Sequence, residues 1–131
     1  MNLKQKLIEE AKKYIGVTEQ GDNAGKMVEE FQKAVDGKAQ HESWCCAFVM
    51  YCLSKVEQEN GFSSILPKTE HCLTLWNNSP KECKSEMPKV GHLVVWQFYK
   101  EGKPTSNGHI GIVTSVDGMR IKTVEGNTGP S

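Results

Sequence analysis

The spacing of apolar residues changes once along this chain, and this change most limits what the chain can fold into. Up to about residue 76 the apolar residues recur three or four positions apart, as in amphipathic helices. After Pro88 they alternate with polar residues or form short runs rich in Val and aromatics, which is typical of strands. Helices followed by a run of antiparallel strands predict an α+β fold.

Four helices are expected in the first part of the chain. The first covers residues 3–15, and the second begins after Asn23 as N-cap and ends at Gly37. The third begins after Ser43 as N-cap, covers residues 44–56, and is apolar on every side as far as Leu53. That pattern predicts a helix buried in the centre of the domain. A short fourth helix is expected over residues 69–76.

Three strands are expected after them, over residues 92–98, 108–116 and 119–125. Residues 100–107 are expected to form a polar loop built around Gly102 and Pro104. Asp117-Gly118 is a hairpin signal between the last two strands. The whole chain, residues 1–131, is expected to form one domain with its own core.

Charge and hydropathy narrow the classes of function. Lys plus Arg and Asp plus Glu both number 16, and this balance argues against a nucleic-acid-binding protein. No segment approaches the roughly 20 apolar residues of a membrane span. Glu9, Glu10 and Lys12 interrupt any apolar stretch at the N-terminus, so we expect synthesis in the cytoplasm without a signal peptide. We also expect a monomer.

The cysteines and acidic residues do not form a recognisable metal-binding pattern. Five cysteines, an odd number, favour reduced thiols over a disulfide framework. No Cys-x-x-Cys pair has a matching pair downstream, so no zinc site is expected. The acidic residues upstream of Cys45, among them Glu19, Asp22, Asp36 and Glu42, lack the clustered alternation of a calcium loop. We therefore expect no metal and no cofactor.

Cys45 and one of four histidines are candidates for nucleophilic catalysis, which needs a thiolate and a base within hydrogen-bond reach. Cys45 lies at the expected start of the third helix, where free amides and the helix dipole favour an anion. The alternative is that Cys45 is a small core residue. Of the histidines, His109 lies in a strand between two glycines that let another element approach closely. The other three are His41, His71 and His92.

Four segments resemble the CHAP family, the cysteine- and histidine-dependent amidohydrolases and peptidases. Residues 44–49 (WCCAFV) resemble its nucleophile motif, in which a cysteine opens the central helix. Residues 108–113 (GHIGIV) resemble its histidine strand, and residues 124–127 (VEGN) resemble the strand that follows. Residues 88–96 (PKVGHLVVW) are similar to the strand before the histidine. That strand usually carries Asp where this chain has His92, so the role of His92 is open.

The resemblance implies a papain-like α+β fold, with N-terminal helices packed on an antiparallel sheet. It implies that Cys45 is the nucleophile, that His109 is the general base, and that Glu125 or Asn127 orients the imidazole. The family cleaves amide bonds of bacterial peptidoglycan through a thioester. The bond lies either between the glycan and its stem peptide, as for an N-acetylmuramoyl-L-alanine amidase, or within the peptides.

Three further residues are candidates for contact with the substrate. Trp44 and Trp96 could stack on a sugar or a peptide, although aromatics beside a central helix also pack in cores. Gln40 could help to form an oxyanion hole, as a glutamine upstream of the cysteine does in papain-like enzymes. We expect the protein to reach the cell wall by release, as a phage endolysin does, or by delivery as an effector.

Two other functions remain open at this point. A related cysteine amidase acting on a small cytosolic conjugate, such as glutathionylspermidine, would use the same residues. A catalytically inactive wall-binding module is the alternative without an enzyme activity.

The strand register poses a conflict that the structure must resolve. A regular two-residue turn at Asp117-Gly118 would place Glu125 and Asn127 on the sheet face opposite His109. Catalysis requires the other parity, with Gly111 opposite Glu125. We therefore predict either an odd-length loop at residues 117–119 or a β-bulge between this turn and His109.

Overall fold

The computed structural model describes residues 2–14, 26–36, 44–69, 71–85, 87–118 and 120–126. Within these residues helices come first and strands follow, so the α+β prediction is confirmed. The elements are α1 (Leu3–Lys12), α2 (Lys26–Asp36), α3 (Cys45–Asn60), α4 (Cys72–Asn78), a 3-10 helix η1 (Lys81–Cys83), β1 (Leu93–Lys100), β2 (Lys103–Asp117) and β3 (Arg120–Val124).

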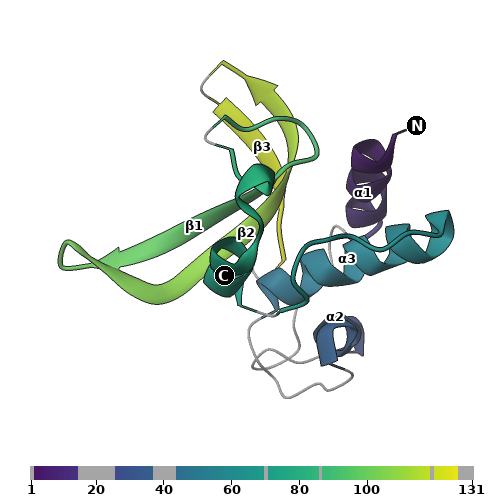
Figure 1. The fold of residues 1–131 in the computed structure, drawn as a ribbon, viewed down its shortest axis with the longest axis horizontal. Helices are drawn as coiled ribbons and strands as arrows, with labels where there is room; N and C mark the ends of the chain where they lie inside the picture. The colour runs from purple at the N-terminus through teal and green to yellow at the C-terminus, as the bar shows by residue number, and fades with distance from the viewer. Residues whose placement is uncertain are drawn as a thin grey trace.

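The described strands form one antiparallel sheet in the order β1-β2-β3, so the strand with the histidine is central. Helix α3 packs against β2 and against α1 and α2, and α1 also contacts β2 and β3 (Figure 1). Helix α4 contacts β1 and β2. The start of α3 therefore lies where helices and sheet meet.

Helix α3 is buried as its composition predicts. Nine of its apolar residues are buried, among them every residue from Cys45 to Met50. A helix that is apolar all round needs partners all round, and α1, α2 and the sheet supply them. Trp44 rather than Ser43 is its N-cap, and the helix runs four residues further than expected, to a left-handed Gly61 with φ 67°.

The other helices differ from the prediction at their ends. Helix α1 ends at Lys12 rather than at residue 15, and α4 begins at Cys72 rather than at residue 69. The hydroxyl of Thr69 accepts a hydrogen bond from the His71 amide instead. The expected caps and stops at Asn23 and Gly37 lie outside the described residues.

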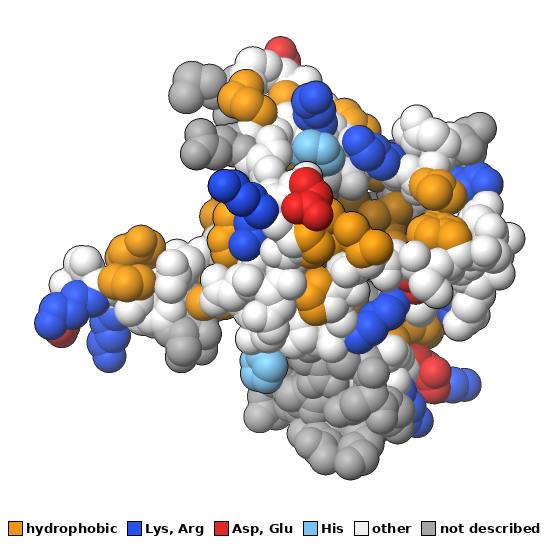
Figure 2. Space-filling view, in the orientation of Figure 1, with side chains coloured by type: hydrophobic (Ala, Val, Ile, Leu, Met, Phe, Trp, Pro, Cys, Tyr) orange, Lys and Arg blue, Asp and Glu red, His pale blue; other side chains and the backbone are white. Residues whose placement is uncertain are grey.

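The expected polar loop over residues 100–107 is wrong, because these residues belong to a β-hairpin arm. Lys100 pairs with Lys103, and Tyr99 pairs with Pro104. Between them Glu101 and Gly102 have φ of 54° and 77°, the positive values that a tight two-residue hairpin turn needs. The arm projects from the body of the protein, and hydrophobic and basic side chains lie along it (Figures 1 and 2).

The β2–β3 ladder contains the predicted β-bulge. Asp117 pairs with Arg120, so the chain reverses one residue later than expected. The register then shifts between Ser115 and Val113, because Thr114 is an extra residue on β2. This shift restores the parity that catalysis requires and brings Glu125, which follows β3, beside Gly111.

An aromatic cluster around Phe31 joins α2 to α3. Phe31 is fully buried, and its ring stacks on Trp44 with centroids 5.7 Å apart. Edge contacts with Tyr14, Phe48 and Tyr51 surround it. Among the described helices, none combines the length and apolarity that crossing a bilayer requires.

We expect Phe31→Ala to lower the free energy of unfolding by about 3–5 kcal/mol, because it leaves a cavity where α2, α3 and Trp44 meet. Phe98→Ala is the matched control, since this ring on the arm is 51% exposed. Its loss should stay below about 1 kcal/mol. Denaturant titration measures both values, and equal losses would show that Phe31 is not central to the core.

Candidate active site

Cys45 is the first residue of α3, and its side chain meets β2 and α4. It is 4% exposed, and its Sγ lies 3.3 Å from the Sγ of Cys72 at the start of α4. Its thiol also hydrogen bonds with the His109 ring on β2. The buried thiol therefore has two side-chain partners, a base and a second thiol.

His109 is held between two elements of the sheet. It pairs with Trp96 across the β1–β2 ladder, and the two rings stack with centroids 5.7 Å apart and planes 23° apart. On its edge, Nε2 lies 2.8 Å from Oε1 of Glu125. Because an ionised carboxylate can only accept, Nε2 carries the proton and Nδ1 is the nitrogen left to accept the thiol proton of Cys45.

Glu125 is fixed on both of its carboxylate oxygens. Oε1 accepts from His109, and Oε2 accepts from the hydroxyl of Thr123, two residues back along the chain. Residues two apart on a strand share a face, so Thr123 reaches the same side of the sheet as Glu125. The hydrogen bond with Thr123 therefore helps to hold the carboxylate in position beside the imidazole.

Glycines leave the space that this arrangement needs. A Cβ on Gly111 would lie 2.7 Å from Cγ of Glu125, so any other residue there would displace the carboxylate. A Cβ on Gly126 would lie 2.8 Å from Cβ of Phe48 and 3.0 Å from the Trp44 ring. Gly126 thus lets the chain after β3 lie against the start of α3.

The contacts of His109 favour its charged form. Its pKa is raised above the ordinary value of 6.5. The hydrogen bond with Cys45 is the largest cause, and the hydrogen bond and charge of Glu125 act in the same direction. Burial acts against them but does not cancel them.

The thiol of Cys45 behaves differently from the sequence expectation of a thiolate-favouring helix start. The hydrogen bond with Cys72 and burial raise the pKa of Cys45 to about 12, and the hydrogen bond with His109 only partly opposes them. The contact with Cys72 is the larger cause, and burial adds to it because burial of a thiol disfavours its charged form. The resting thiol is therefore protonated at neutral pH.

The start of α3 also offers backbone donors. Trp44 at the N-cap makes no side-chain capping hydrogen bond, and the helix is sixteen residues long. The first amides of a helix point their N–H groups outward, along the positive end of its dipole. Such donors next to Cys45 are suited to stabilise an oxyanion.

The other predicted site residues either play a different structural role or lie outside the described residues. Trp44 is 5% exposed and stacked on Phe31, which favours its alternative role in core packing. Trp96, at 37% exposed, remains accessible beside His109. Gln40, Asn127 and His41 lie outside the described residues, so their roles stay predictions.

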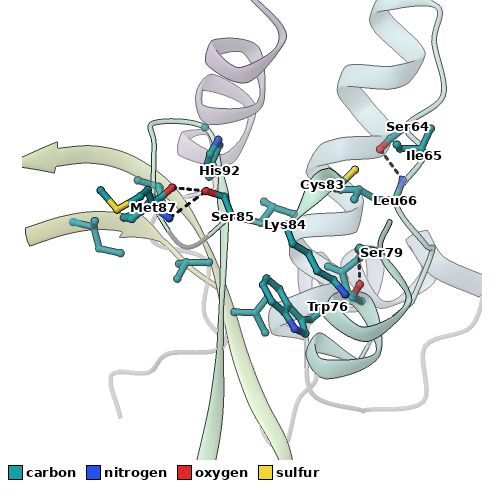
Figure 3. Close-up of a pocket in the computed structure, with 18 residues that line it drawn as sticks. Ser64, Ile65, Leu66, Trp76, Ser79, Cys83, Lys84, Ser85, Met87 and His92 are labelled. Atoms are coloured by element: carbon teal, nitrogen blue, oxygen red, sulfur yellow. Dashed lines mark hydrogen bonds between the residues drawn. The ribbon is translucent and has the colours of Figure 1, made fainter. Parts of the chain in front are cut away.

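His92 and His71 do not join the group formed by Cys45, His109 and Glu125. His92 precedes β1 and lines a separate cavity of about 550 Å³ between α4, η1 and the sheet (Figure 3). Burial lowers the pKa of His92, and the charges of Lys4 and Lys89 lower it further. His71 is the exposed N-cap residue of α4.

Sequence reasoning missed two residues of the site. Thr123 had a usable signal, because it lies two positions before Glu125 on a predicted strand. Cys72 had none, since only the packing of α4 against β2 brings it to Cys45. Among the described residues, no group of three or more His, Cys, Asp or Glu is arranged to hold a metal ion.

Comparison with known protein families finds a match over most of the chain. The family model described as CHAP domain matches residues 36–127, which include α3, α4 and the whole sheet. This chain belongs to the CHAP family. The resemblance inferred from its motifs is confirmed, and membership implies a peptidoglycan hydrolase of the amidase or peptidase kind. No curated protein and no solved structure matches the chain.

We expect Glu125→Gln to lower the pKa of His109, because the variant removes the negative charge that helps to raise it. His109 should then lose its proton at lower pH than in the unchanged protein. NMR titration of the His109 ring measures this, with Asp117→Asn as a control on the far end of β2. An unchanged or higher pKa would show that Glu125 does not act on the ring.

We expect Gly111→Ala to shift the pKa of His109 in the same direction without removing any charge. The new methyl group displaces Glu125 from Nε2, so the hydrogen bond that favours the charged ring is lost. Ser115→Ala, on the same strand and across the bulge, is the control. If Gly111→Ala leaves the titration unchanged, Glu125 and Gly111 are not in contact in solution.

Proposed function

We propose that this CHAP domain hydrolyses an amide bond of bacterial peptidoglycan, with Cys45 as nucleophile and His109 as general base. The observation that supports this most directly is the contact chain from Cys45 to His109 to Glu125. A nucleophile, a base in contact with it and a group that orients the base are the requirements of covalent acyl transfer. The family match adds the substrate class.

The proposed reaction begins with attack by Cys45 on the substrate, during which its thiol proton passes to Nδ1 of His109. The sulfur attacks the carbonyl carbon, and the amides at the start of α3 stabilise the oxyanion that forms. The C–N bond then breaks, His109 gives its proton to the leaving amine, and a thioester remains on Cys45. Water then gives a proton to His109 and attacks the thioester, and the C–S bond breaks. The acid leaves and ionises to the carboxylate, and His109 returns its proton to the sulfur of Cys45.

Glu125 keeps Nε2 protonated and holds the ring plane throughout this cycle. It also stabilises the imidazolium that exists while the thiol proton resides on His109. Because the resting thiol is protonated, proton transfer to His109 accompanies the attack on the substrate. A preformed thiolate is not needed.

We propose that Trp96 contacts the substrate. One face of its ring stacks on His109, and 37% of the residue is exposed next to the reacting groups. An exposed aromatic surface is suited to a sugar ring or to the apolar edge of a peptide. Gln40 and Asn127 remain proposed contributors to the oxyanion hole and to orientation of His109.

We expect Cys45→Ser to reduce release of soluble fragments from purified cell walls by roughly 10³-fold or more, because the hydroxyl cannot replace the thiol. Cys46→Ser should keep most activity. Cys46 lies on the next position of α3, and its Sγ donates to the carbonyl of Thr69, 3.2 Å away. Loss of turbidity measures the activity, and circular dichroism checks that both variants fold.

Two outcomes would contradict the proposal. If Cys45→Ser and Cys46→Ser lose activity equally while both fold, Cys45 is not established as the nucleophile. If the protein leaves walls intact but cleaves a soluble conjugate such as glutathionylspermidine, the substrate is that conjugate and not peptidoglycan. Where walls are digested, mass spectrometry of the fragments identifies the bond that is cut.

A further inference from the structure

The thiols of Cys45 and Cys72 are close enough to form a bond. Their sulfur atoms lie 3.3 Å apart, whereas a disulfide needs about 2.05 Å, so roughly 1.3 Å of approach is required. The two residues open different helices and are 27 positions apart in sequence. Both are buried, at 4% and 6% exposed.

We propose that Cys45 and Cys72 are an oxidation site, in which Cys72 captures oxidised Cys45 as a reversible disulfide. The sulfur of Cys72 already lies beside the sulfur of Cys45, the nucleophile of the proposed hydrolysis. No step of that hydrolysis uses Cys72. A second thiol beside a nucleophilic cysteine is the arrangement of a resolving cysteine.

The other cysteines are placed differently. The thiol of Cys46 donates to the carbonyl of Thr69 and also hydrogen bonds with Cys72. Cys46 is therefore the alternative disulfide partner of Cys72. Cys52 is buried further along α3, where the charges of Glu10 and Lys13 act on it. Cys83 is exposed on η1. All five cysteines lie in the described part of the chain as reduced thiols.

The proposed oxidant is a hydroperoxide. The sulfur of Cys45, after giving its proton to His109, attacks the terminal peroxide oxygen. An S–O bond forms, the O–O bond breaks, and the alcohol or water leaves with the proton from His109. The sulfur of Cys72 then attacks the sulfenic sulfur, the S–O bond breaks, and the thiol proton of Cys72 leaves with the hydroxide as water. Two thiols lose two electrons, and the peroxide gains them.

The disulfide would stop the proposed hydrolysis, because Cys45 could no longer form a thioester. This consequence rests on the proposed function, whereas formation of the bond rests on the distance between the sulfurs and on the contact of Cys45 with His109. A dithiol reductant would restore both thiols and the activity. Without Cys72, continued oxidation of Cys45 to the sulfinic and sulfonic acids would be irreversible.

The test uses the full chain with hydrogen peroxide as the oxidant. We expect two of the five thiols to be lost, together with two hydrogen atoms of mass and no added oxygen. Tandem mass spectrometry should find one cross-link, between the peptides that contain Cys45 and Cys72. Dithiothreitol should return all five thiols. Oxygen added to Cys45 without a cross-link in the unchanged protein would overturn the proposal.

Single variants identify the pair. The cross-link should persist in Cys46→Ser and in the exposed control Cys83→Ser, and it should disappear in Cys45→Ser and Cys72→Ser. In Cys72→Ser, peroxide should add oxygen to Cys45 that dithiothreitol does not remove. A cross-link that survives in Cys45→Ser but not in Cys46→Ser would assign the bond to Cys46 and Cys72, and would overturn the proposal.

The thiol chemistry and the hydrolase activity are measured separately. A reduced protein that leaves cell walls intact but forms the cross-link would contradict the proposed function and support this site. A protein that digests walls before and after peroxide, with all thiols retained, would support the function and contradict the site.

Discussion

The extra residue at Thr114 in the β2–β3 ladder is the constraint on which the candidate site depends. Side chains alternate between faces along a strand, so a ladder without the bulge at Thr114 would turn Glu125 away from His109. With the bulge, Glu125 contacts both Nε2 and the hydroxyl of Thr123. The bulge also lets the ladder near the hairpin keep its own register.

Burial at the start of α3 sets the chemistry of the thiol. The position that offers backbone amides to an oxyanion also removes Cys45 from water. The hydrogen bond with Cys72, together with this burial, raises the pKa of Cys45 to about 12. A buried, protonated thiol is a weak nucleophile until a base accepts its proton. His109 has that capacity because it is in contact with the thiol and because Glu125 stabilises its charged form. The same packing places the sulfur of Cys72 3.3 Å from that of Cys45, where the proposed disulfide would form.

The prediction of the fold from sequence succeeded where a pattern had one physical explanation. An apolar stretch longer than a strand could only be the buried helix α3, and the register conflict required a bulge or an odd loop. The prediction of a loop over residues 100–107 was wrong because polar residues are equally common in a loop and in a solvent-exposed hairpin arm. Composition alone therefore does not distinguish the two. Helix ends shifted by a few residues, since caps such as Trp44 depend on surrounding packing rather than on side-chain chemistry.

The sequence by itself determined the class of fold, the family and the order of its motifs, including Cys45 and His109, because these follow from local spacing and local residue type. Only the tertiary structure decided which groups touch. The hydrogen bond from His109 to Glu125, the position of Cys72 at 3.3 Å from Cys45 and the protonated state of the thiol all arise between elements far apart in the chain. Distances and dielectric environments of that kind are set by how helices pack on the sheet, and no local pattern encodes them.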